Sequence, residues 1–430
     1  MSLNVAKVIK LSVITSVFSK SSGLIFQVLA IPLALSALGT EGFARFMIYT
    51  GLTTWVGLSA TGIAPTLTSK IASGLKNSDL IKNLYNALIF VSILMFFIGL
   101  PIFSLVIFFF GEKLGGIEEL NLVYVYLFIG LLIIFSLVDS VNAGHNKVYI
   151  TNAFQTLGSL LNLIILFMLI KLLNVKDDLF LFFASQSGLM LSKLLNFSFI
   201  LKRLQWTYAD LNFDRKIMLE LKNNFFSFIF IQLSVAFSQQ AIVIFTYTQS
   251  AVLSATLSVI YRLYSIMGSL LTMISQPLWP LIIGIRKKGD FLLLKKWYIR
   301  LLMYNFLVSS SLAFIVVLFK SEVNEYWLKG NIVISQAEYF LLLLNFVFIA
   351  IGQVNITFLM GYEKFKKISL MLTIEAMLLF GLVVLFTELK LLNVSLMMSI
   401  SIISFLLTSF LIGSIEVNRA LREASDYSIN

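Results

Sequence analysis

The chain of 430 residues contains no cysteine and only one histidine, His145. Disulfide bonds and thiol chemistry are therefore excluded. The single histidine lies in an expected short loop, where it has no partners for a metal site or a catalytic triad. A Gly-rich phosphate-binding loop of the Walker type is also missing, so the sequence gives no sign of ATP hydrolysis. These absences argue against an enzyme, and no cofactor is expected.

Charged residues are also scarce, at 12% of the chain against 59% hydrophobic residues, whereas ordinary soluble domains carry about 25% charge. Apolar runs of about 18 residues or more, each able to cross a bilayer core of about 30 Å, recur along the whole length. We therefore expect an all-α integral membrane protein with about 12 transmembrane helices. The expected spans are residues 11–38, 46–66, 84–110, 122–143, 153–173, 179–201, 225–247, 251–283, 297–319, 336–359, 369–389 and 395–415.

Lysine and arginine are distributed unevenly among the segments that join these spans. Most of the 32 fall in segments that share one side of the membrane with both termini. The positive-inside rule then makes that side cytoplasmic. The net charge of +11 follows from this topology and does not indicate a nucleic-acid partner, because no soluble basic domain is present. The first apolar stretch is too long for a signal peptide and lacks a cleavage site, so we expect an uncleaved anchor.

The chain repeats itself at about half its length. Residues 144–147 open an apolar stretch that ends in Lys-Leu-Leu-Asn-Val at 171–175, and residues 361–364 open another that ends in the same string at 390–394. Such a repeat in an apolar chain is typical of two-lobed membrane transporters. Equal, even numbers of spans in the two halves predict parallel lobes around a central cavity. The expected division is an N-terminal six-helix lobe at 1–201, a cytoplasmic amphipathic linker at 202–224 and a C-terminal six-helix lobe at 225–430.

Two expected spans carry a helical stripe of polar residues that includes one cation. The stripe residues singled out are Lys20 and Gln27 in the first span, and Ser258, Arg262, Ser265 and Gln276 in the eighth. Helix packing explains the serines but accounts poorly for a cation in each stripe. We therefore expect the stripes to line a hydrated cavity in which Lys20 and Arg262 contact an anion. Arg45, at the outer start of the second span, is a third candidate, with an interfacial anchor as the alternative.

Acidic residues occur inside two expected spans, at Asp139 and Glu375. A carboxylate in hydrocarbon needs a proton or a cationic partner, so both are candidate coupling sites for H⁺ or Na⁺. A buried ion pair within one lobe is an equally good interpretation. Lys193, near a cytoplasmic end, is interpreted as a side chain that snorkels to the interface. The adjacent acids at 177–178 are interpreted as the start of a helix.

Two short segments carry a resemblance to a known family. They are Gly-His-Asn-Lys-Val-Tyr-Ile-Thr-Asn at 144–152 and Gln-Pro-Leu-Trp-Pro at 276–280. With the span pattern, the basic link and the short external loops, the chain resembles the polysaccharide branch of the multidrug/oligosaccharidyl-lipid/polysaccharide exporter superfamily. More narrowly, it is similar over its whole length to O-antigen (Wzx-type) lipid-linked oligosaccharide flippases.

The resemblance implies a flippase of the bacterial cytoplasmic (inner) membrane. Its substrate would be an undecaprenyl-diphosphate-linked oligosaccharide, moved from the inner to the outer leaflet by alternating access. Its partners would be the lipid bilayer and other polysaccharide-assembly membrane proteins. A drug or small-solute exporter of the same superfamily remains an alternative, and it would favour an acidic or aromatic cavity. A polysaccharide polymerase is the enzyme alternative, and it would carry a large external loop rich in arginine and histidine, which this sequence lacks.

Overall fold

The computed structural model describes residues 2–57, 62–72, 77–101, 103–104, 117–145, 147–205, 211–275, 282, 285–286, 290–362 and 364–426. Helices, turns and short irregular segments make up this part of the chain. Contacts divide the protein into two units, Met1–Gln232 and Leu233–Asn430. The predicted linker at 202–224 therefore falls within the first unit, where it includes the end of one helix and the start of the next.

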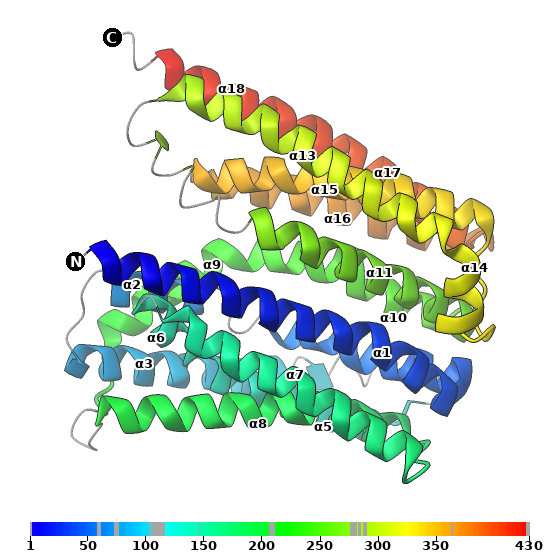
Figure 1. Ribbon diagram of the computed structural model, residues 1–430, viewed down its shortest axis with the longest axis horizontal. Coiled ribbons are helices and arrows are strands. Elements are labelled where there is room, and N and C mark those ends of the chain that lie inside the picture. The colour runs from blue at the N-terminus through cyan, green and yellow to red at the C-terminus, as the bar shows by residue number, and fades with distance from the viewer. Residues whose placement is uncertain are drawn as a thin grey trace. The chain divides into compact units, whose positions relative to one another are not determined.

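The first unit is built around three long helices that pack along one another. Its elements are α1 (Ser2–Gly57), α2 (Ile63–Ala72), α3 (Asn77–Ser92), η2 (Ile93–Gly99), α5 (Glu119–Ser136), α6 (Asp139–Gly144), α7 (Val148–Lys171), α8 (Asp178–Leu204) and most of α9 (Arg215–Val235). Both α1 and α8 pack along α7, and α5 lies against α1 and α8 (Figure 1). The short helices α2 and α6 pack on each other.

The second unit is a bundle in which α15 is central. Its elements are η5 (Ala236–Ala241), α10 (Ile242–Tyr247), α11 (Ala251–Ser275), α13 (Phe291–Leu318), α14 (Lys320–Glu322), η6 (Val323–Trp327), α15 (Gln336–Gly361), α16 (Phe365–Glu388), α17 (Val394–Phe405), η7 (Leu406–Ile412) and α18 (Gly413–Asp426). Helix α15 contacts α11, α13, α16, α17, η7 and α18. The segments labelled η are π-helical, and η7 joins α17 to α18 without a break.

Ten helices in the described residues are long and apolar enough to cross a membrane, against about twelve expected from the apolar runs. The first, Ile14–Thr53, has 40 residues, which corresponds to about 60 Å of helix and is twice a bilayer core. Gly39 interrupts it with a φ of 66°, so it contains two of the expected spans. Helix α8 has 27 residues but is more polar and is not among the ten. The prediction of an all-α, multi-span membrane protein is confirmed.

The repeated string occupies corresponding turns in the two halves. Helices α7 and α16 have 24 residues each, and they end at Lys171 and Glu388. Each copy of Lys-Leu-Leu-Asn-Val therefore lies at the turn that follows one of these helices. The turns differ locally, because the positive φ falls on Asn174 in the first copy and on Lys390 in the second. The sequence repeat thus marks a repeated helix–turn–helix.

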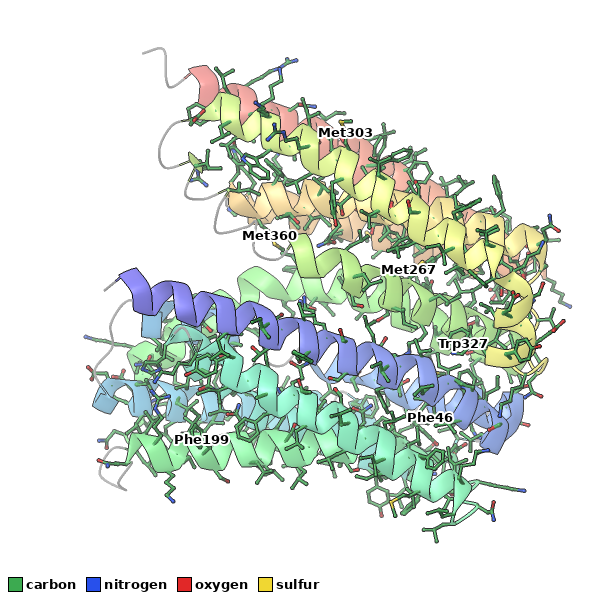
Figure 2. All side chains as sticks on the ribbon, viewed as in Figure 1. Phe46, Phe199, Met267, Met303, Trp327 and Met360 are labelled. Atoms are coloured by element: carbon green, nitrogen blue, oxygen red, sulfur yellow. The ribbon has the colours of Figure 1, made fainter. Side chains whose placement is uncertain are left out.

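Apolar side chains cover the outside of both units. Phe199 and Met303 are 46% and 61% exposed, whereas Phe46 and Met267 are 5% and 3% exposed (Figure 2). Many other large apolar residues are exposed as well, which is rare on soluble proteins. Small polar residues are instead buried between helices, as is common in bundles surrounded by lipid.

Helices α7 and α8 approach closely at two glycines. A Cβ atom added to Gly158 would lie 2.6 Å from Ser192 Oγ. A Cβ atom added to Gly188 would lie 2.6 Å from the backbone nitrogen of Asn162. Because backbone atoms cannot move aside as a flexible side chain can, Gly188 is the more restrictive position.

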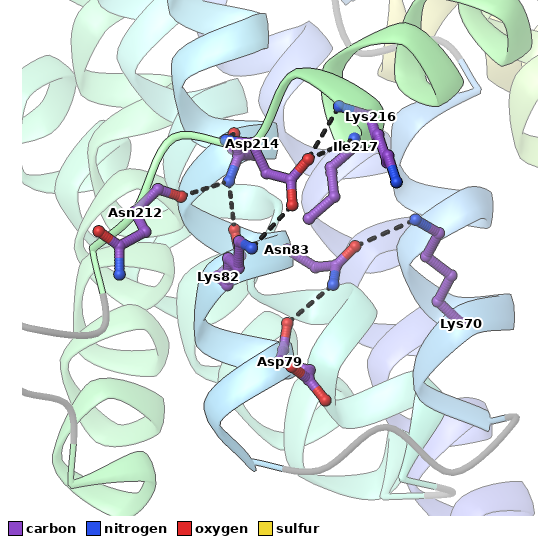
Figure 3. Close-up of polar contacts among 9 residues, drawn as sticks. Lys70, Asp79, Lys82, Asn83, Asn212, Asp214, Lys216 and Ile217 are labelled. Atoms are coloured by element: carbon purple, nitrogen blue, oxygen red, sulfur yellow. Dashed lines mark hydrogen bonds and ion pairs between the residues drawn. The ribbon is translucent and has the colours of Figure 1, made fainter.

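The segment before α9 is tied to α3 by a cluster of polar contacts (Figure 3). Asn86 Nδ2 donates to the carbonyl oxygen of Asn212 at 2.9 Å, and the backbone N–H of Asp214 donates to Asn86 Oδ1 at 2.9 Å. Lys82 Nζ lies 2.7 Å from Asp214 Oδ2. This part of the predicted linker is therefore docked on the first unit.

A second ion pair extends this docking into α9. Lys70 Nζ, on α2, lies 2.6 Å from Glu220 Oε2 and donates to Asn83 Oδ1 at 3.1 Å. Asn83 Nδ2 in turn donates to the carbonyl oxygen of Asp79 at 2.8 Å (Figure 3). Because both ions are partly exposed, the pair fixes the position of α9 more than it stabilises the fold.

Gly188→Ala is expected to destabilise the protein by about 1–3 kcal/mol, because the added methyl must displace the α7 backbone. A melting curve in detergent should show a lower Tm for Gly188→Ala than for the wild type. The control is Gly381→Ala in α16, where an added Cβ would meet nothing within 4 Å. Equal melting temperatures for the two variants would contradict the close approach of α7 and α8.

Docking of the linker is expected to depend on pH through Asp214. The hydrogen bond from Lys82, with the backbone N–H groups of Lys216 and Ile217, holds the pKa of Asp214 below its ordinary value of 3.8. Asp214 has a lower pKa in the docked segment than in the free one. Docking is therefore favoured above pH 3.8 and is lost as the pH falls through the lowered pKa.

The absence of native cysteine allows a single nitroxide label at Phe213→Cys, an exposed position of the docked segment. We expect the label to become more mobile on acidification below pH 3.8. In an Asp214→Asn background it should already be mobile at neutral pH. Equal mobility in both backgrounds at neutral pH would show that Asp214 does not hold the linker.

Candidate functional site

Helix α11 carries most of the polar stripe predicted for the eighth span. In its first half the stripe is packed, because Ser258 is buried and Ser254, a stripe residue one turn earlier, donates from Oγ to the carbonyl oxygen of Val243 at 2.9 Å. In its second half the stripe opens, with Arg262 half-buried and Ser265 exposed. The packing interpretation thus describes one half of α11. Gln276 and the segment 276–280 lie outside the described residues.

Arg262 is a cation that has no carboxylate partner in the described part of the chain. Among the described residues it forms no hydrogen bond and no ion pair. Ser258, one helical turn earlier, has a buried Oγ atom that also has no partner in the described part of the chain. A guanidinium has five N–H donors, so leaving it unpaired within a span is costly. Arg262 is therefore available to an anionic ligand.

Aromatic rings hold the arginine's segment of α11. Tyr261 and Tyr264 meet edge to face, with 6.2 Å between ring centroids. Tyr264 also stacks on Phe346 of α15, again with 6.2 Å between centroids. These contacts tie the turn that bears Arg262 to the centre of the second unit, so the guanidinium projects from a firmly packed helix.

In α1, Lys20 and Gln27 are half-buried, and each has an interaction partner. Neighbouring positions of α1 face α7. Asn152 Nδ2 donates to Thr15 Oγ1 at 3.2 Å, and a Cβ atom at Gly23 would lie 4.0 Å from Ser159 Oγ. This part of α1 therefore packs on α7, while Lys20 remains a candidate anion contact on the first unit.

Arg45 has a different environment from the one expected. It pairs with Asp178 at the start of α8, and its Nη1 atom lies 2.9 Å from Glu41 Oε1. Two carboxylates balance its charge, and the pair with Asp178 joins α1 to α8. The interpretation of residues 177–178 as a helix start is confirmed, because the Phe180 N–H donates to Asp177 Oδ1 at 2.6 Å.

Asp139 is compensated within the first unit. It pairs with Lys193 of α8 and accepts a hydrogen bond from Asn196 Nδ2 at 2.8 Å. Asn196 Oδ1 accepts in turn from Asn142 Nδ2 at 3.1 Å. Of the two interpretations of Asp139, this geometry favours the ion pair over a coupling site. Lys193 is therefore paired, and the expectation that it snorkels is corrected.

Glu375 is the other acid expected inside a span, and its environment differs from that of Asp139. It is 3% exposed in α16 and forms no ion pair among the described residues. Two hydroxyl groups from η7 contact its Oε2 atom, Thr408 Oγ1 at 2.6 Å and Ser409 Oγ. π-Helical turns often lie at functional sites. Glu375 therefore forms a buried polar site that no cation neutralises within the described residues.

Sequence periodicity does not identify the hydroxyl partners of Glu375. Thr408 and Ser409 are consecutive residues, so a helical stripe of period 3.6 includes only one of them. The π-helical turn brings both to the same carboxyl oxygen. The position of an acid within an apolar span is the one signal in the sequence that points to this site.

Comparison with known proteins identifies the fold. No family model matches the sequence, and no curated protein matches it. A multidrug resistance MATE family transporter of the MOP superfamily, solved in an inward-facing conformation, superposes with a TM-score of 0.69 at 14% identity, covering 96% of each chain.

Two further solved structures agree. A MOP superfamily transporter from Pyrococcus furiosus superposes with a TM-score of 0.65 at 14% identity, covering 97% of this chain and 96% of its own. A MATE transporter from Vibrio cholerae superposes with a TM-score of 0.63 at 13% identity, covering 98% and 97%. Over nearly its whole length, the chain has the fold of the MATE transporters of the MOP superfamily.

Proposed function

We propose that the protein is a lipid-linked oligosaccharide flippase. Its substrate would be an oligosaccharide on undecaprenyl diphosphate, such as an O-antigen repeat unit. Transport would run from the inner to the outer leaflet of a bacterial cytoplasmic membrane, with both termini cytoplasmic. Other membrane proteins of polysaccharide assembly would be its partners.

The observation that carries this proposal is the cation at Arg262, which no acid compensates in the part of the chain that the structure describes. A planar guanidinium matches the oxygen atoms of a phosphate with two parallel hydrogen bonds. Its charge has no carboxylate among the described residues to compete with such a ligand. An anionic head group inside the span would supply the missing partner.

Lys20 supplies a second cation, from the first unit. We propose that, during alternating access, Lys20 on α1 is an anion contact of the first unit and Arg262 on α11 is an anion contact of the second. A flexible ammonium suits a contact that forms and breaks in each cycle. The sugars would be hydrated during passage, and the polyprenyl tail would remain in lipid.

A drug exporter is the second candidate, because several structures with this fold are multidrug transporters. Cationic drugs need an acidic contact; Asp139 is already paired with Lys193, and Glu375 is 3% exposed within α16. The Pyrococcus furiosus transporter is described as having a binding pocket of reverse polarity that suggests a different function. We choose the flippase over the drug exporter on the same property, the charge of the proposed site, because Arg262 would repel a cationic drug.

Arg262→Ala is expected to slow the flipping of a labelled undecaprenyl-diphosphate oligosaccharide in proteoliposomes. Loss of hydrogen bonds to a charged group costs about 1.5–3 kcal/mol, or roughly a 10- to 100-fold lower rate at low substrate concentration. Arg262→Lys keeps the charge but loses the planar fork, so its rate should lie between those of the alanine variant and the wild type.

The matched control is Arg300→Ala, which removes an exposed arginine from α13. This variant should flip the substrate at the wild-type rate. Equal rates for Arg262→Ala and the wild type would remove Arg262 from the anion site. Export of cationic drugs by a wild type that flips no lipid-linked glycan would contradict the flippase proposal itself.

A further inference from the structure

A basic patch, formed by Lys147, Lys202 and Arg203, lies at the end of the first unit where α7 begins and α8 ends. Lys147 directly precedes the first residue of α7, and Lys202 and Arg203 are in the last turn of α8. The two helices are joined by a short turn at their other ends and pack along each other (Figure 1). Their antiparallel arrangement therefore brings the three cations to the same end of the unit.

No acid along α7 and α8 offsets this patch. From Lys147 to residue 209 the sequence contains two acids, Asp177 and Asp178, and both lie where α8 begins. The 27 residues of α8 correspond to about 40 Å, so these acids are far beyond the reach of an ion pair. Helix α1, which packs along both helices, has no acid before Glu41.

Acids of the neighbouring elements already have other partners. Asp214 pairs with Lys82, and Glu220 pairs with Lys70. Among the described residues, the three cations of the basic patch form no ion pair and no side-chain hydrogen bond. The patch is therefore open to an anion from outside the described part of the chain.

The repeat in the sequence provides an internal comparison. Arg203 near the end of α8 and Arg422 near the end of α18 are separated by the same offset as the two copies of Lys-Leu-Leu-Asn-Val. In the second copy, α18 also carries Glu416, which pairs with Lys367 at 3.2 Å. The corresponding part of α8 contains no acid. The lack of a balancing carboxylate is thus a property of the first copy and not of the repeat.

The cations of the patch repel one another. Partial burial, and then the positive charge of Arg203, hold the pKa of Lys147 below its ordinary value of 10.5. Lys147 also precedes the N-terminus of α7, which is the positive end of the helix dipole. An anion held between Lys147 and Arg203 would offset this repulsion.

An apolar surface continues from the patch along the two helices. Phe154 of α7 and Phe199 of α8 meet with 6.3 Å between their ring centroids. Leu191, Leu195 and Phe199 are all exposed and follow one another at four-residue intervals on one face of α8 (Figure 2). Arg203 comes one turn after Phe199 on the same face. The exposed apolar face of α8 therefore ends at the cations.

A ligand that fits both parts has phosphate oxygens at one end and hydrocarbon chains at the other. We propose that this end of the first unit binds an anionic phospholipid of the surrounding membrane, with its phosphate at Lys147 and Arg203 and its acyl chains on Leu195 and Phe199. Clusters of lysine and arginine at a membrane surface attract anionic lipids. A zwitterionic head group would add a further cation to the patch. This site belongs to the first unit, and it does not depend on the proposed function.

Lipid contact at this face can be measured with a bimane fluorophore on Leu195→Cys, because the chain has no native cysteine. The labelled full chain is reconstituted in phosphatidylcholine bilayers. Part of the lipid is then replaced by phosphatidylglycerol or phosphatidylcholine with brominated chains, which quench the fluorophore on contact. We expect phosphatidylglycerol to associate with this face about tenfold more strongly than phosphatidylcholine.

The double variant Lys147→Ala/Arg203→Ala should reduce this preference to less than about twofold. Lys147→Arg/Arg203→Lys keeps both charges and should keep the preference. The matched control is Arg215→Ala/Lys222→Ala, which removes the same charge from exposed positions of α9 in the same unit. It should also keep the preference.

An equal preference with and without the side chains of Lys147 and Arg203 would overturn the inference. An equal loss in the Arg215→Ala/Lys222→Ala control would also overturn it, since overall charge would then explain the result. Undecaprenyl diphosphate should relieve the quenching no better than unbrominated phosphatidylglycerol does. Relief at a lower mole fraction would assign the patch to a diphosphate lipid and contradict the proposal of a membrane phospholipid.

Discussion

The constraint on which this protein depends is that every charge within the bilayer must find a partner there. Water is absent from the hydrocarbon, so an uncompensated ion is costly. The structure meets this constraint in three ways. Asp139 is paired with Lys193, and Arg45 is held by two acids. Glu375 accepts hydrogen bonds from two hydroxyl groups at its Oε2 atom. Arg262 has no such partner among the described residues, and this difference makes it the candidate for a ligand contact.

In this fold the backbone N–H and C=O groups form their hydrogen bonds within helices. Polar contacts between helices are therefore made through side chains. Small residues allow close contacts, such as the approach of α7 and α8 at Gly158 and Gly188. Three helix–helix contacts in the second unit use amide and hydroxyl groups. Asn345 Nδ2 donates to Ser401 Oγ at 2.9 Å. Asn355 accepts from the Tyr298 hydroxyl at 2.7 Å and donates to the Ser409 carbonyl oxygen at 2.8 Å. The last of these contacts reaches Ser409 in the π-helical turn next to Glu375.

Hydropathy alone predicted the multi-span helical fold, because apolar length is a strong signal in membrane proteins. The repeat at 171–175 and 390–394 also marked corresponding turns, since both copies follow helices of equal length. The count of spans was harder to obtain, because Gly39 divides one continuous helix and α8 is more polar than the others.

The candidate site was only partly predictable. Arg262 was visible in the sequence because a cation interrupts an apolar helix. Whether such an ion has a partner depends on residues far away in the chain, as the pairing of Asp139 with Lys193 illustrates, and one sequence does not contain that information. The contacts of Thr408 with Glu375 also depend on a π-helical turn, for which periodicity gives no signal.

The measurement that tests the central claim most directly is binding of undecaprenyl diphosphate and of uncharged undecaprenol to the purified protein in nanodiscs. The two lipids share the same tail, so their affinities differ only through the head group. If an uncompensated cation recognises the diphosphate, the charged lipid should bind about tenfold more tightly or better, and high salt should reduce the difference. Equal affinities for the two lipids would contradict the account.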